Sequence, residues 1–104
     1  FVGETFIEND LGHAYMELGL SQLEENDLPI SKEYLKRAAV HSLISDAITR
    51  YRPLSRGMRS EFYTTTYKQL GIVLEKLGWK EEARFFEKEH RKWRVVLEDE
   101  NRGS

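Results

Sequence analysis

One nine-residue pattern occurs twice in this chain of 104 residues. The first copy is Leu-Gly-His-Ala-Tyr-Met-Glu-Leu-Gly at residues 11–19, and the second is Leu-Gly-Ile-Val-Leu-Glu-Lys-Leu-Gly at residues 70–78. Each copy reads Leu-Gly, two residues, a large apolar residue, two residues, Leu-Gly, and the copies lie 59 residues apart. A repeated segment constrains the fold because such units bury their apolar faces by stacking on one another. The repeat therefore predicts a helical scaffold that binds other proteins.

Composition narrows the class of protein. A chain of this length forms one domain, here residues 1–104, and no apolar run approaches the roughly 18 residues that span a bilayer. We therefore expect no membrane partner. The absence of cysteine excludes disulfides and thiolate metal sites and fits a reducing compartment, so we expect a cytoplasmic protein. No signal peptide is visible, and the first residue is Phe1 rather than Met, which suggests an excerpt or a processed product.

Charge is unevenly distributed along the chain. Residues 1–31 carry seven acidic residues and no lysine or arginine, whereas residues 32–80 carry ten basic residues and four acidic ones. We interpret these blocks as two solvated faces that attract each other across the fold. The alternative is a basic patch for an acidic ligand, formed by Arg50, Arg52, Arg56 and Arg59.

Apolar residues at spacings of three and four predict four amphipathic helices, at about residues 4–25, 31–51, 58–77 and 80–98. Ser31 is the predicted N-cap of the second helix, and Gly78 is the predicted stop of the third. The fold class is therefore all-α, with antiparallel helical hairpins joined by short loops. The predicted buried faces comprise, in chain order, Ile7, Leu11, Ala14, Tyr15 and Leu18; Leu35, Ala38 or Ala39, Leu43, Ala47 and Tyr51; Phe62 or Tyr63, Tyr67, Leu70 and Leu74; and Ala83, Phe86, His90, Trp93 and Leu97.

The repeated pattern resembles the first helix of a tetratricopeptide repeat (TPR). After the second copy, the run at residues 79–83 resembles the turn and the small alanine that open the second helix of such a repeat. His90 departs from the pattern, because a smaller residue is usual there. In the first copy the second helix fits only after an insertion of about 16 residues, with Pro53 near the usual end. The resemblance implies a right-handed array of about four helices in two units, at about residues 5–53 and 58–97.

The resemblance also implies where a partner binds. In this family the groove is lined by outward residues of the first helix in each unit. Carried over to this chain, the partner-binding residues are Phe6, Asn9, His13, Met16, Glu17, Thr65, Lys68, Ile72, Glu75 and Lys76. Among them, Asn9 and Lys68 offer a hydrogen bond and a positive charge to a peptide carboxylate. The expected partner is another protein or a peptide, with no cofactor and no catalysis.

Two alternatives have a sequence basis. Arg84 and His90 resemble the paired Arg and His of the HEPN family of small helical ribonucleases, in which Arg stabilises phosphate charge and His moves a proton. Against this, six residues along a helix place the two side chains about 120° apart. The second alternative is a nucleic-acid scaffold, with aromatic residues beside the arginines stacking on bases. The pI of about 6.0 disfavours it.

Metal binding and self-association complete the expectations. His13 lies four residues before Glu17 on one helical face, but no third ligand follows, so we expect a surface polar pair and no metal site. The fourth helix has more apolar surface than one neighbouring helix can cover. We therefore expect contact with a second copy, or with the rest of a longer parent chain, through Phe85, Trp93 and Val96.

Overall fold

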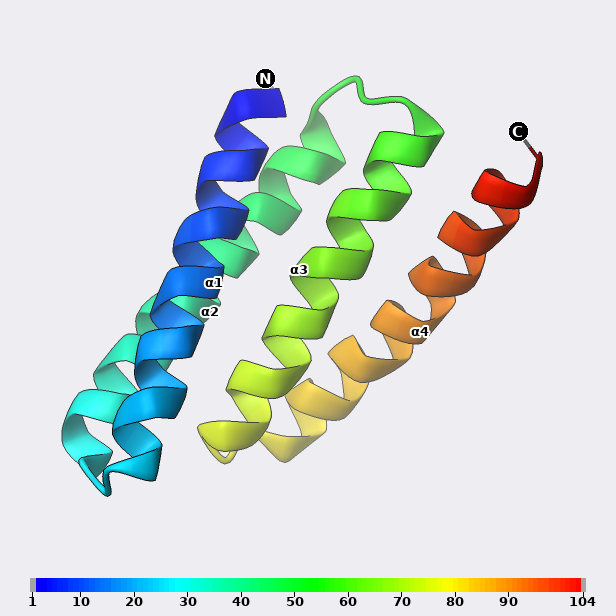
Figure 1. Ribbon diagram of the computed structural model, residues 1–104. Coiled ribbons are helices and arrows are strands. Elements are labelled where there is room, and N and C mark those ends of the chain that lie inside the picture. The colour runs from blue at the N-terminus through cyan, green and yellow to red at the C-terminus, as the bar shows by residue number, and fades with distance from the viewer. Residues whose placement is uncertain (1, 104) are drawn as a thin grey trace.

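Four helices make up nearly all of the computed structural model, which describes residues 2–103 of the backbone and the side chains of residues 4–102. Helix α1 is Val2–Glu24, α2 is Leu28–Tyr51, α3 is Arg56–Lys76 and α4 is Lys80–Gly103. The described residues contain no strand, so the prediction of an all-α fold is confirmed. Helices α1, α2 and α3 lie side by side, whereas α4 starts beside the end of α3 and diverges from the other three (Figure 1).

The ends of the helices follow local capping chemistry. The Asp27 side chain accepts a hydrogen bond from the Ile30 backbone nitrogen at 3.4 Å and caps α2. The prediction that Ser31 caps this helix is wrong, because Ser31 is buried one turn inside α2, and its hydroxyl donates to the Gly19 carbonyl at 2.8 Å. Gly78 has a φ of 89° just after α3, as its predicted role as a stop requires.

Small residues let α1 and α2 approach closely. A Cβ atom on Gly12 would lie 2.9 Å from the Ser42 Oγ, and one on Gly19 would lie 2.7 Å from the Leu35 Cγ. The buried face of α1 consists of residues spaced by four and three, namely Thr5, Asn9, Gly12, Met16 and Gly19. The close contact of the two helices therefore requires small side chains rather than large apolar ones.

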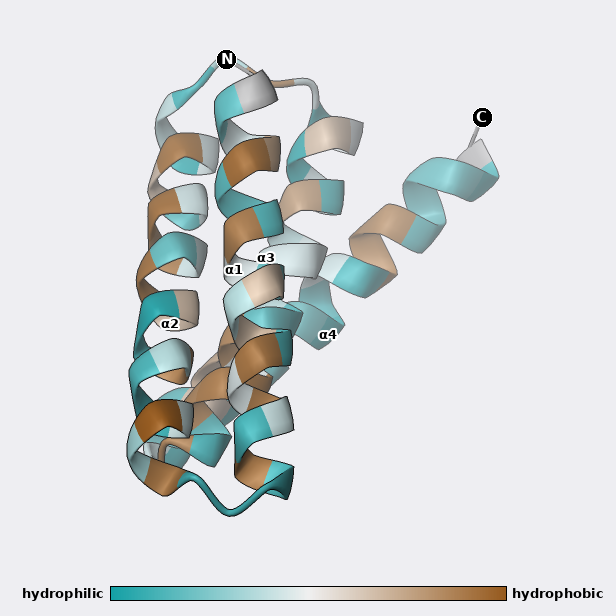
Figure 2. Ribbon diagram, turned by 60° about the vertical axis from the view of Figure 1, so that its left-hand side comes forward, coloured by the Kyte–Doolittle hydropathy of each residue, from teal (hydrophilic) through white to brown (hydrophobic). Residues whose placement is uncertain are grey.

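The predicted buried face of α1 is therefore wrong except at Tyr15, which is partly buried and packs against the core. Ile7, Leu11 and Leu18 are 60%, 37% and 45% exposed, and Ala14 is exposed as well. The same holds for part of α2, where Leu43, Ala47 and Tyr51 are exposed although Leu35, Ala38 and Ala39 are buried as predicted. The outward faces of both helices thus expose several large apolar side chains to solvent. Figure 2 shows hydrophobic segments recurring along their length.

Helix α3 is the centre of the fold. Its buried residues include those predicted, and Leu70 and Val73 are fully buried. The backbone of α4 comes close to α3 and to neither of the other two helices (Figure 1). The predicted inner face of α4 is confirmed, because Ala83 is buried and Phe86 and Trp93 pack against the core, with the Trp93 ring centroid 4.8 Å from that of Tyr63. Near its C-terminus, Glu100 pairs with Arg56 at 2.8 Å.

Helices α2 and α3 share a polar contact at Tyr67. Its hydroxyl donates to Asp46 Oδ1 at 2.5 Å, and Arg50 donates both to the other carboxylate oxygen and to the Tyr67 oxygen. Burial, followed by the hydrogen bond to Asp46, raises the pKa of Tyr67 well above its ordinary value. A pKa raised by folding contributes stability below the unfolded pKa of about 10, and this contribution is lost as pH rises through the folded pKa.

We therefore expect the free energy of unfolding to decrease above about pH 10, and we expect the Tyr67→Phe variant to lose part of this decrease. Urea unfolding followed by circular dichroism between pH 8 and pH 11.5 measures the slope. Tyr51→Phe is the matched control, because the Tyr51 side chain is 86% exposed. An alkaline slope that is the same for Tyr67→Phe and the parent chain would contradict this account.

Candidate functional site

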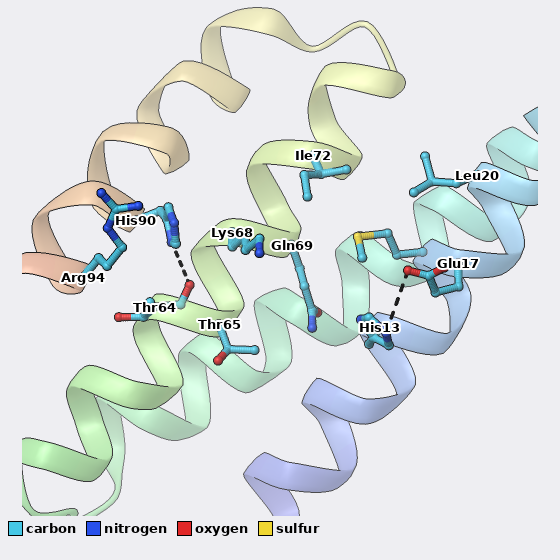
Figure 3. Close-up of a pocket in the computed structure, with 11 residues that line it drawn as sticks. His13, Glu17, Leu20, Thr64, Thr65, Lys68, Gln69, Ile72, His90 and Arg94 are labelled. Carbon is cyan, nitrogen blue, oxygen red and sulfur yellow. Dashed lines mark hydrogen bonds and ion pairs between the residues drawn. The ribbon is translucent and has the colours of Figure 1, made fainter. Parts of the chain in front are cut away.

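An open groove lies between α1, α3 and α4, and its volume is about 630 Å³. It is lined by His13, Met16, Glu17 and Leu20 from α1, by Thr64, Thr65, Lys68, Gln69 and Ile72 from α3, and by His90 and Arg94 from α4. Figure 3 shows α3 between the other two walls, with Glu17 and His13 on one side and His90 and Arg94 on the other. The groove exists because α4 diverges from α1 while remaining attached to α3.

The floor of the groove is held by core contacts. Met16 is only 6% exposed, and Ile72 is half-buried on the facing helix. The Gln69 side chain is fixed at both ends, because its Oε1 accepts from Ser42 at 3.1 Å and its Nε2 donates to the Asn9 carbonyl at 3.4 Å. The floor therefore offers apolar surface of fixed shape, which favours a buried apolar group of a ligand.

The two walls of the groove differ in charge. On α1, His13 Nε2 lies 3.8 Å from Glu17 Oε1, and both side chains are exposed. The opposite side carries cations: Lys68 forms no ion pair with any described residue, and Arg94 has only a long 3.8 Å contact with Glu98. A ligand with a carboxylate directed at Lys68 and Arg94 would therefore fit this wall.

His90 is held in a defined orientation. Its Nδ1 lies 2.9 Å from the Thr64 carbonyl, and because a carbonyl only accepts, the ring donates from Nδ1. The Nε2 of the neutral ring is then an acceptor. This hydrogen bond explains how a polar residue fits into the α3–α4 contact, where His90 departs from the tetratricopeptide pattern.

The structure brings six of the ten predicted partner-binding residues into the groove. They are His13, Met16, Glu17, Thr65, Lys68 and Ile72. Phe6 lies outside it, half exposed, with its ring centroid 5.0 Å from that of Phe62. Glu75 lines smaller cavities between α3 and α4, and Lys76 is exposed in the last turn of α3.

Asn9 is placed differently from the prediction. It is 6% exposed, and its Oδ1 accepts a hydrogen bond from Thr66 at 2.9 Å, so the side chain serves the α1–α3 contact. Sequence reasoning also missed the contribution of α4. His90 and Arg94 line the groove because α4 is tilted, and helical periodicity carries no information about such a tilt.

The Arg and His of the ribonuclease alternative do not line a common cavity among those described. Arg84 lines a small cavity with Glu75 and Glu87, whereas His90 lines the groove and a neighbouring cavity that Arg84 does not reach. Among the described residues, no three His, Asp or Glu side chains gather in a way that could hold a metal ion. His41 pairs with Glu8 at 2.6 Å and stacks on Tyr15.

The four arginines of the predicted basic patch form ion pairs or hydrogen bonds within the fold. Arg50 pairs with Asp46, Arg52 with Glu4 at 2.9 Å, and Arg56 with Glu100. Arg59 donates to two backbone carbonyls near the α2–α3 loop. The Arg52–Glu4 pair joins the acidic first helix to the basic segment, as expected of charged faces that attract each other across the fold.

The three residues expected to mediate self-association have different surroundings. Phe85 is 56% exposed, Val96 is half-buried, and Trp93 packs against Tyr63 inside the α3–α4 contact, with the two rings tilted by 40°. Only Phe85 therefore presents a large apolar surface to solvent.

Over the described residues, none of the four helices has the length and apolar character needed to cross a membrane. Comparisons of the chain with family models, with curated protein sequences and with solved structures found no match in any of the three. The groove and its neighbouring surfaces are therefore the observations on which a function can be proposed.

Proposed function

We propose that the chain is a tetratricopeptide-like interaction module that binds a segment of another protein in the groove between α1, α3 and α4. The observation that carries this proposal is the groove itself, a cavity of about 630 Å³ lined by both first helices of the predicted units. The glycines of the two pattern copies add support. Gly12 lies against α2 and Gly71 against α4, so each permits the close approach of the paired helix.

The lining defines the kind of segment that fits. Met16, Leu20 and Ile72 provide an apolar floor, and Lys68 and Arg94 provide positive charge on the side away from Glu17. The ligand is accordingly a peptide with an apolar anchor residue and an acidic residue a few positions away. Peptides that enter such grooves bind mainly through a buried anchor, while charge sets orientation and specificity.

The experiment begins with peptides selected from a random phage-displayed library on the immobilised protein. The selected peptide is then titrated into isotope-labelled protein while amide shifts are recorded. We expect the largest shifts at groove residues such as Thr65 and Ile72, and we expect selected sequences to contain an acidic residue near an apolar one. Shifts confined to the outer side of α2 would contradict the groove assignment.

Charge reversal tests the recognition directly. We expect the double variant Lys68→Glu/Arg94→Glu to weaken binding of the acidic peptide roughly 100-fold, because two favourable charge contacts become repulsive. The matched control is Lys32→Glu/Lys88→Glu, which changes two exposed lysines outside the groove lining. Isothermal titration calorimetry measures both, and equal affinities for the two double variants would overturn the proposed orientation.

A further inference from the structure

The outer face of the α1–α2 hairpin is apolar and uncovered. We define this outer face by Ile7, Leu11 and Leu18 on α1 and by Val40 and Ile44 on α2, which are between 37% and 60% exposed. On α1, Ile7, Leu11, Ala14 and Leu18 are spaced by four, three and four, the spacing of a helix–helix seam. An exposed apolar seam of three turns indicates a surface that another helix covers.

The two halves of the outer face lie on one surface of the hairpin. Tyr15 stacks on His41 with ring centroids 5.4 Å apart, which forms an aromatic contact between the helices. Leu11 lies one turn before Tyr15, and Ile44 lies one turn after His41, so both aliphatic side chains lie next to this contact. The outer face is therefore continuous across α1 and α2.

Charge indicates what covers this face. Helix α1 carries five acidic residues and no lysine or arginine. Helix α2 carries four basic residues and two acidic ones; Arg37 and Arg50 pair with those two, which leaves the charges of Lys32 and Lys36. A second α1 would be repelled by the first, but α2 of a second copy has the opposite sign of net charge and exposes the aliphatic side chains of Val40 and Ile44. The chain thus contains, on one hairpin, both halves of a complementary pair.

Symmetry then fixes how two copies meet. A two-fold axis parallel to the helices places each α1 on α2 of the other copy in antiparallel orientation, whereas an axis perpendicular to them places α1 on α1. The first arrangement pairs opposite charges and closes as a dimer. Within one copy, His41 pairs with Glu8 and stacks on Tyr15, so it lies level with Leu11, which is midway between them. A two-fold axis parallel to the helices leaves each residue at the same height along the helices. Leu11 therefore meets Val40 and Ile44 of the second copy, which flank His41 on α2.

We propose that the protein forms a two-fold dimer through this outer face, with α1 of each copy lying on α2 of the other to give a four-helix contact. The proposal is independent of the groove, which opens on the side of α1 that carries His13 and Glu17 and stays accessible in the dimer. It differs from the sequence-based expectation of contact through α4, whose Trp93 already packs on Tyr63.

Sedimentation equilibrium of the full chain from 1 µM to 500 µM provides the first test, and we expect a monomer–dimer equilibrium. Leu11→Lys and Ile44→Glu each place a charge against an apolar patch twice per dimer. We expect each to raise the dimer Kd at least about tenfold. Both positions are exposed in the monomer, so circular dichroism should show unchanged folding. Val95→Lys, at a 54% exposed position on α4, is the matched control and should leave the Kd unchanged.

Mixing Leu11→Lys with Ile44→Glu tests the arrangement. In an equimolar mixture, the heterodimer pairs the introduced lysine of one copy with the introduced glutamate of the other at one contact, and it keeps the parent residues at the second contact. We therefore expect its Kd to be at least about tenfold lower than that of either variant alone. A heterodimer Kd as high as that of the single variants would overturn the pairing of α1 with α2. A monomer at all concentrations, or self-association lost on Phe85→Ser but kept in Leu11→Lys, would overturn the outer face as the dimer contact.

Discussion

Replacing Gly19 by valine is expected to lower the free energy of unfolding by about 3 kcal/mol, because there is no space for a side chain where α1 meets α2. A Cβ at this position would lie 2.7 Å from both the Cγ and the Cδ2 of Leu35 and 3.3 Å from its backbone nitrogen. Leu35 is 1% exposed and cannot move aside without disturbing the core. Urea unfolding followed at 222 nm measures the loss.

Three further variants make this prediction specific. Gly57→Val is the control, because no atom lies within 4 Å of a Cβ at that position, and we expect a change of no more than about 0.5 kcal/mol. Leu35→Ala alone should cost about 2–5 kcal/mol through the cavity that it leaves. In the double variant Gly19→Val/Leu35→Ala, the valine occupies that cavity. The loss of unfolding free energy in this variant should therefore be smaller than the sum of the two single losses by more than about 1 kcal/mol. Additive costs would show that Gly19 and Leu35 do not share the contact.

Replacing Thr66 by valine is expected to lower the free energy of unfolding by about 2–4 kcal/mol, although the two side chains have nearly the same shape. The Thr66 hydroxyl donates to Asn9 Oδ1 at 2.9 Å and lies 3.2 Å from the Ser45 Oγ, and all three side chains are buried. Valine leaves the Asn9 oxygen and the Ser45 hydroxyl without this partner in a place that water does not reach.

The control for Thr66 is Thr65→Val, one residue away on the exposed side of α3, where the hydroxyl bonds only to the Glu61 carbonyl of its own helix. We expect this change to alter stability by no more than about 0.5 kcal/mol. Chemical denaturation at equilibrium, with the midpoint and slope fitted together, compares the two variants. Equal losses for Thr65→Val and Thr66→Val would mean that the buried hydroxyl network contributes nothing specific.

Helix type and helix number followed from periodicity, because Leu35, Leu70 and Ala83 lie where spacings of three and four place them. The burial of α1 did not follow. Periodicity identifies the face that carries the large apolar residues, and on α1 this face is exposed. The α1–α2 contact instead uses Gly12 and Gly19, which a hydrophobicity pattern does not register.

The candidate groove was predictable only in part. The family resemblance implied lining residues on outward positions of α1 and α3, such as His13 and Lys68, and both line the groove. The participation of Arg94 depends on the angle between α3 and α4. Gly78 turns the chain with a φ of 89° and Ala83 is buried where α4 begins, but no local sequence pattern encodes the angle between the two helices.

Because α4 packs on α3 alone, it is the least supported wall of the candidate groove. The backbone of α4 touches neither α1 nor α2, so one hairpin turn and one helix–helix contact set the width of the groove. Helices with few long-range contacts open at lower free energy than the rest of a fold, and their amide protons exchange with solvent sooner. A ligand that touches both α1 and α4 would link two helices that the chain itself leaves apart. Occupancy would therefore register as slowed hydrogen exchange along α4, far beyond the residues that the ligand contacts.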